Sequence, residues 1–63
     1  MLVRKLASSC DDGDCPTLYA TDRGTLLVQG ETPGDHGLTL PGNETVVEIP
    51  MELIQKAIRD NLI

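Results

Sequence analysis

Residues 17–29 read TLYATDRGTLLVQ, and this stretch decides the fold. Two runs of residues that favour β-strands flank Asp22-Arg23-Gly24, a pattern typical of a three-residue hairpin loop with a left-handed glycine. If Thr21 lies opposite Thr25, side-chain alternation places Tyr19 opposite Leu27 on one face, among threonines and Gln29. The other face is then wholly apolar: Leu18, Ala20, Leu26 and Val28. Turn chemistry and burial pattern therefore predict one antiparallel hairpin.

The residues on both sides of this hairpin predict further strands. Leu38 and Leu40 lead into Pro41-Gly42, the preferred central pair of a type II turn, and the β-prone run 45–49 follows. We therefore expect a second hairpin over residues 38–49, joined to the first by a mobile connection. Residues 2–6 add a weaker strand signal. The predicted sheet is small, antiparallel and made of two hairpins, with an extra strand at 2–6.

A C-terminal amphipathic helix is predicted over residues 50–61. Pro50 suits a first turn, where its missing N–H costs nothing, and Glu52 complements the positive end of the helix dipole. Apolar residues then recur at helical spacing, at Leu53, Ile54, Ala57, Ile58 and Leu62. The fold class is therefore α+β, and 63 residues allow a single domain, residues 1–63, whose core must be aliphatic.

The charge balance argues against nucleic acid and membranes as direct partners. Ten acidic and five basic residues give a net charge of −5, whereas DNA binding relies on clustered Lys and Arg side chains. No segment approaches the roughly 20 apolar residues of a membrane span. Arg4 and Lys5 interrupt the N-terminal apolar residues, which disfavours a signal peptide. We expect a cytoplasmic protein.

Cys10, Cys15 and His36 are the candidate metal ligands. Four residues separate the cysteines, the wide end of zinc-site spacing, and a fourth nitrogen or sulfur ligand is missing from the sequence. In a reducing compartment we expect a pair of loop thiols, while a regulatory disulfide or a metal site stays open as an alternative. No cofactor is predicted.

Catalytic motifs are not found in the sequence. Asp35-His36 is the pair nearest to a general base, but it lies in a loop rich in Pro and Gly without a partner nucleophile. The aspartates at 11, 12 and 14 lack the frame of an EF-hand and read as a solvated turn. The prediction is therefore a protein without enzymatic activity, in which the apolar pair Tyr19 and Leu27 is the candidate interface.

The string CPTLYATDRGTLLVQG, residues 15–30, resembles small actinobacterial proteins that carry the same CPT, TDRG and VQG elements. Those proteins are in turn distantly similar to BldB-like accessory domains, which are associated with helix-turn-helix regulators. The resemblance implies a non-enzymatic homodimer that binds a helix-turn-helix regulator and so affects transcription indirectly. The alternative function is a small thiol- or metal-responsive protein that uses Cys10 and Cys15.

Overall fold

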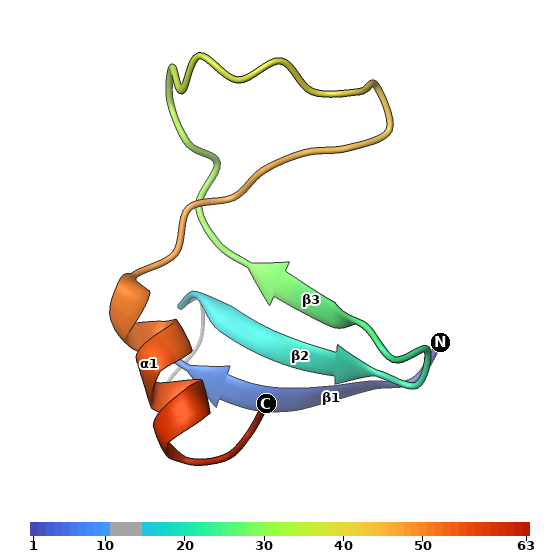
Figure 1. The fold of residues 1–63 in the computed structure, drawn as a ribbon, viewed down its shortest axis with the longest axis vertical. Coiled ribbons are helices and arrows are strands. Elements are labelled where there is room, and N and C mark those ends of the chain that lie inside the picture. Colours follow the sequence, from blue (N-terminus) through green and yellow to red (C-terminus); the bar gives the residue numbers. More distant parts are fainter. Residues whose placement is uncertain (11–14) are drawn as a thin grey trace.

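The computed structural model describes residues 1–10 and 15–63. Three strands, β1 (Val3–Ser8), β2 (Thr17–Thr21) and β3 (Leu26–Gln29), precede one helix, α1 (Met51–Arg59) (Figure 1). The strands form an antiparallel sheet in the order β1-β2-β3. The predicted class, an α+β fold with an antiparallel sheet and one C-terminal helix, is confirmed.

The hairpin of β2 and β3 has the predicted register. Tyr19 pairs with Leu27 and Leu18 with Val28, and the Thr21 N–H donates to the Thr25 carbonyl at 3.0 Å. Gly24 has a φ of 74°, the left-handed conformation that the three-residue loop requires. Local turn chemistry alone was sufficient to specify this element.

The weak strand signal near the N-terminus corresponds to β1, which begins one residue later than predicted and continues to Ser8. Its register with β2 shifts between Lys5 and Ala7, a β-bulge that leaves Leu6 as the extra residue. The bulge places Ala7 opposite Leu18, so that both side chains are buried in the core. Two bonds between Leu2 and Asp22, each of 3.1 Å, tie the start of the chain to the hairpin turn.

The predicted helix is present, although it is shorter than residues 50–61. Pro50 is its N-cap, and the Leu53 N–H donates to the Pro50 carbonyl at 3.1 Å. At the other end Asn61 has a φ of 55°, and the Leu62 N–H donates to the Ala57 carbonyl at 2.8 Å. The Asn61 N–H also donates to the Ile58 carbonyl, at 3.1 Å, and the two C-terminal bonds form a Schellman motif that stops the helix at Arg59.

The prediction of a second hairpin over residues 38–49 was wrong. These residues contain no strand, and the only pairing nearby is an isolated bridge between Glu31 and Glu48. A turn does form, but the bond from the Glu44 N–H to the Pro41 carbonyl makes Gly42-Asn43 its central pair, one residue later than expected. Residues 31–48, which we call the arm, instead leave the sheet beyond β3 and return to α1 (Figure 1).

Helix and sheet meet in a small core. The buried apolar side chains of the described chain are Ala7, Leu18, Leu53 and Ala57, with Leu6, Ile49 and Ile54 packed around them. Leu53 and Ala57 lie one helical turn apart, so the helix contacts the sheet along one narrow stripe. Much of the predicted apolar surface therefore stays outside this core.

Candidate interaction surface

The sheet face that carries Leu18, here called the helix-side face, is only half covered. Leu18 is fully buried, but Leu26 and Val28 on the same face remain 45% and 41% exposed. On the hairpin this face is wholly apolar, as the pairing register requires, yet two of its four apolar side chains stay exposed. The reason is the position of α1, which packs over β1 and the near end of β2, so that the core of the described chain contains no residue of β3.

More apolar side chains are exposed on the helix and on the arm. Ile58 lies on α1 outside the buried stripe and is exposed, as are Leu62 and Ile63 beyond the helix end. On the arm Leu38 is 61% exposed, and Leu40 and Val47 are also solvent-accessible. Single exposed apolar residues are normal on a protein surface, but here they occur on the sheet, on the helix and on the arm of one small domain.

Tyr19 and Leu27, the predicted interface residues, lie opposite each other on the outer face of the sheet, away from the helix. The Tyr19 hydroxyl donates to Gln29 Oε1 at 3.2 Å, and Lys5 pairs with Tyr19 from β1. Tyr19 is therefore half-buried between its neighbours, while Leu27 is 40% exposed. The outer face also carries Val3, which pairs with Thr21 and is 48% exposed, and its role as an interface stays a prediction.

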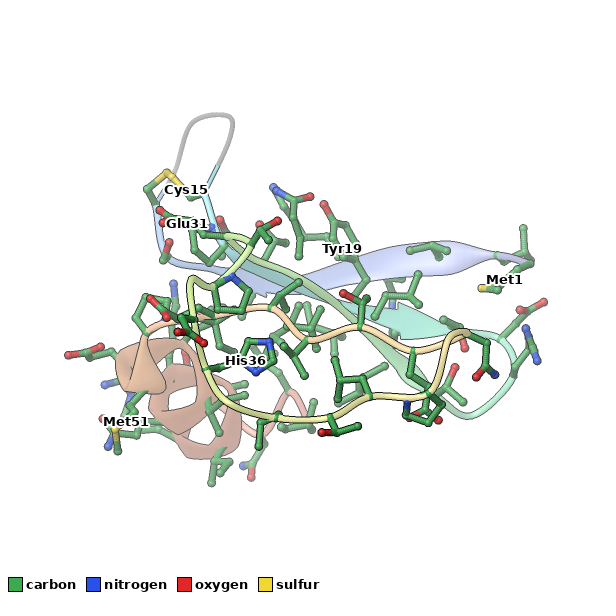
Figure 2. The ribbon with its side chains drawn as sticks, turned by 90° about the horizontal axis from the view of Figure 1, so that it is seen from above. Met1, Cys15, Tyr19, Glu31, His36 and Met51 are labelled. Carbon is green, nitrogen blue, oxygen red and sulfur yellow. A yellow bond between two sulfur atoms is a disulfide. The ribbon has the colours of Figure 1, made fainter. Side chains whose placement is uncertain are left out.

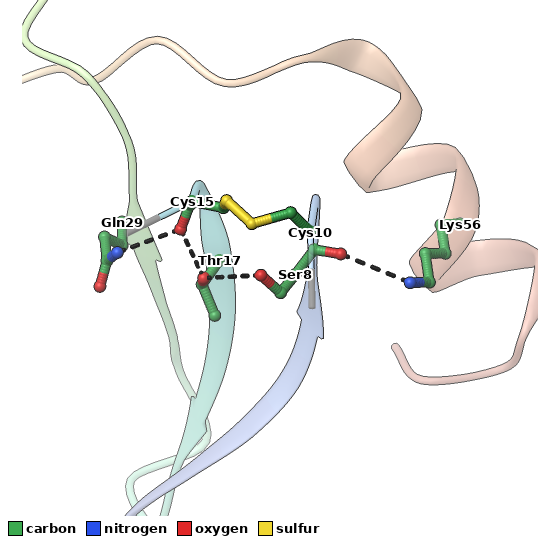
Figure 3. The surroundings of a disulfide bond; sticks show 6 residues. All are labelled: Ser8, Cys10, Cys15, Thr17, Gln29 and Lys56. Atoms are coloured by element: carbon green, nitrogen blue, oxygen red, sulfur yellow. Dashed lines mark hydrogen bonds between the residues drawn. A yellow bond between two sulfur atoms is a disulfide. The ribbon is translucent and has the colours of Figure 1, made fainter. Parts of the chain in front are cut away.

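Cys10 and Cys15 form a disulfide, with their Cα atoms 5.9 Å apart. The expectation of a pair of free thiols was wrong, because the end of β1 and the start of β2 bring the two side chains together across the sheet (Figure 3). A disulfide was an open alternative, but the spacing of two cysteines in a sequence does not distinguish free thiols from a disulfide. The aspartates at 11, 12 and 14 lie outside the described residues.

Hydrogen bonds surround this disulfide and link three strands (Figure 3). The Cys15 carbonyl accepts from the Thr17 hydroxyl at 2.7 Å and from Gln29 Nε2 at 3.1 Å. The Thr17 hydroxyl also lies 3.3 Å from the Ser8 hydroxyl, which satisfies a side chain that is almost completely buried. Lys56 on α1 donates to the Ser8 carbonyl at 3.4 Å and so ties the helix to the end of β1.

His36 is remote from Cys10 and Cys15, the two other candidate metal ligands. Figure 2 shows His36 on the arm and Cys15 at the far corner of the sheet, in the disulfide. His36 Nδ1 accepts from the Leu38 N–H at 3.0 Å, and Asp35 beside it is exposed. Within residues 1–10 and 15–63, no group of three or more His, Cys, Asp or Glu side chains is arranged to hold a metal ion.

None of the helices in the described part of the chain is long and apolar enough to cross a membrane. Comparison with known proteins found no matching family, no matching curated protein and no matching solved structure.

Sequence reasoning missed the apolar residues that stay exposed on the helix-side face and on the arm. Alternation places Leu26 and Val28 on the apolar face of the hairpin, but it does not give the width of the helix that covers this face. Leu38, Leu40 and Val47 were assigned to strands on their β propensity. A usable signal was the length of the segment between β3 and α1, since long connections without regular structure are uncommon in compact domains.

Proposed function

We propose that this protein is a non-enzymatic protein–protein interaction module that binds its partner through the helix-side face. The observation that carries the proposal is the exposure of Leu26 and Val28, 45% and 41%, on the face where Leu18 is fully buried. Strands with one apolar face need a second layer over that face. In this chain α1 supplies only part of the layer, and a partner supplies the rest.

The energetics favour a bound state. Removing apolar surface from water contributes about 25 cal/mol per Å², and a small domain has little stability from its own core. Leu26, Val28 and Ile58 are exposed in the isolated chain, so their burial against a partner stabilises the bound state. Catalysis has less support, because Asp35 and His36 lie exposed on the arm, where the His36 Nδ1 already accepts a backbone hydrogen bond.

The resemblance of residues 15–30 to accessory proteins of helix-turn-helix regulators supports a cytoplasmic module that acts on transcription through a regulator. Tyr19 and Leu27 on the outer face form a second surface that such a partner can use. The two surfaces lie on opposite sides of β3, because Leu26 and Leu27 are neighbours whose side chains point to opposite faces of the sheet.

A photo-crosslinking amino acid at position 26 or at position 27 tests the proposal in the living cell. The two positions are a matched pair, since both leucines lie in β3 with exposures of 45% and 40%. The helix-side proposal predicts protein crosslinks from position 26 and few from position 27. Crosslinks from position 27 alone identify the outer face as the interface, and the absence of crosslinks from both positions rejects the interaction proposal.

The Cys10–Cys15 disulfide favours a second candidate function, a thiol-responsive protein. A reducing cytoplasm favours the two thiols, and oxidising conditions favour the disulfide. Two-electron reduction of the disulfide by a dithiol, with uptake of two protons, therefore converts the chain from the disulfide form to the dithiol form. If this function holds, partner binding in cells changes after the replacement C10S/C15S. Unchanged binding by that variant removes the candidate and leaves the disulfide with a structural role.

A further inference from the structure

We propose that the partner on the helix-side face is a second copy of this chain, and that each copy covers the other with its arm, residues 31–48. This inference rests on the proposed function and names the partner that the module binds. Four features of the chain support it: surface area, the isolation of the arm, its rigid base and its charge.

The surface area is too large for a monomer of this mass. The chain exposes 4991 Å² at 6.8 kDa. Folded monomers follow a scaling with mass that gives roughly 3,950 Å² for a protein of this size, so the excess is about 1,000 Å². A stable interface of standard size buries about 800 Å² on each partner. The excess therefore matches what one dimer interface removes from each copy.

The arm makes almost no polar contact with the rest of its own chain. Within the described residues, the hydrogen bonds of residues 32–47 stay inside the arm, such as those from Leu38 to His36 and from Glu44 to Pro41. The arm also lacks regular structure, yet it carries three exposed apolar side chains: Leu38, Leu40 and Val47. Ordering a segment of this kind costs conformational entropy. That cost is offset only when another surface buries the apolar side chains of the segment.

The base of the arm is fixed, so the arm leaves the body in a defined direction. Glu31 and Glu48 exchange two backbone hydrogen bonds, of 3.1 and 2.8 Å. Beside them the chain packs so tightly that a Cβ on Gly30 would lie 2.6 Å from the Glu48 carbonyl oxygen and 2.7 Å from Ile49 Cγ2. Only glycine fits that approach. The body therefore holds the arm away from its own core, beyond the β3 edge (Figure 1).

Charge favours contact between the arm of one copy and the body of another. The arm holds four acidic residues, Glu31, Asp35, Glu44 and Glu48, and no Lys or Arg. All five basic residues lie outside it: Arg4, Lys5, Arg23, Lys56 and Arg59. Arg4 is opposite Ala20 and so belongs to the helix-side face, at its β1 end. A net charge of −5 would oppose dimerisation, but this uneven distribution lets unlike charges meet across the interface.

In a twofold dimer, the arm of each copy covers the helix-side face of the other. The same arm and the same face are then used on each side, as an isologous interface requires. Nine residues out and nine back allow the arm a reach of at most about 30 Å. The longest extent of the whole molecule is 33 Å, so the arm is long enough to cross the uncovered half of a partner's sheet.

The purified full-length chain tests the inference by sedimentation equilibrium. We expect a mass twice the 6.8 kDa of the chain, and the variants Leu38→Glu on the arm and Leu26→Glu on the face should each weaken the dimer by at least about a hundredfold. Leu27→Glu is the matched control, because it places the same charge on the same strand but on the outer face. All three side chains are already exposed, so the variants keep the fold, which circular dichroism verifies.

Three results overturn the inference, and each has a distinct meaning. A wild-type monomer at micromolar concentration excludes the second copy as the partner, while crosslinks from position 26 to another protein would still uphold the proposed function. A dimer that only Leu27→Glu disrupts places the interface on the outer face. A dimer that Leu26→Glu disrupts but Leu38→Glu leaves intact removes the arm from the interface.

Discussion

Reduction of the Cys10–Cys15 disulfide is expected to remove a large part of the stability of this domain. The two cysteines are five positions apart, so the bond closes a loop of about six residues. The chain-entropy relation assigns such a loop about 2 kcal/mol of stabilisation at 25 °C. A core of this size supplies about 3–5 kcal/mol in total, so the reduced protein retains roughly half of its free energy of unfolding. Few single bonds in the chain have comparable weight.

Urea unfolding of the oxidised protein, the reduced protein and C10S/C15S measures this contribution. A slope near 1 kcal/mol per M for a small domain converts the loss into a midpoint about 2 M lower. The samples are compared at one protein concentration, because a dimer makes the midpoint depend on concentration. The reduced protein and the double serine variant should agree, since both lack the bond and keep the Thr17 bond to the carbonyl of residue 15. Equal midpoints for the oxidised and reduced proteins would refute the reasoning.

Two further predictions concern the core and the base of the arm. Leu53→Ala truncates a side chain that is 2% exposed and should lower the free energy of unfolding by about 2–5 kcal/mol, which a thermal melt detects. The control Gln55→Ala changes an exposed side chain and should alter that free energy by less than about 0.5 kcal/mol. Similar melts for the two variants would contradict the proposed core. Gly30→Ala should accelerate amide hydrogen exchange at Glu31 and Glu48, because its Cβ would collide with the Glu48 carbonyl. The control is Gly34→Ala, whose Cβ meets no atom within 4 Å and which should leave that exchange unchanged. Equal exchange in both variants would show that the base of the arm is not tightly packed.

The elements that local chemistry determines were predictable from the sequence. The Asp22-Arg23-Gly24 loop fixed the register of β2 and β3, and the glycine takes the expected left-handed conformation. Apolar periodicity found the helix, and the Leu53–Ala57 stripe is the part of that pattern that reaches the sheet. In each case the signal lies within a few residues of the element that it specifies.

Features that depend on distant contacts were not predictable. Leu38 and Val47 have the strand propensity of a hairpin, but Glu31 and Glu48 pair only at the base and the segment between them stays open as the arm. Propensity in a strand mostly reports how a side chain packs on a sheet, and here no second strand is available to pack against. The disulfide was equally hidden, because only the pairing of β1 with β2 brings Cys10 to Cys15.

The most direct test of the central claim, that the arm of one copy covers the helix-side face of another, is an isotope-filtered NOE experiment on a mixture of labelled and unlabelled chains. The account predicts intermolecular NOEs from the methyl groups of Leu38 and Leu40 to those of Leu26 and Val28, which lie in the uncovered half of the sheet. An absence of intermolecular NOEs, or NOEs that involve only Tyr19 and Leu27, would contradict it.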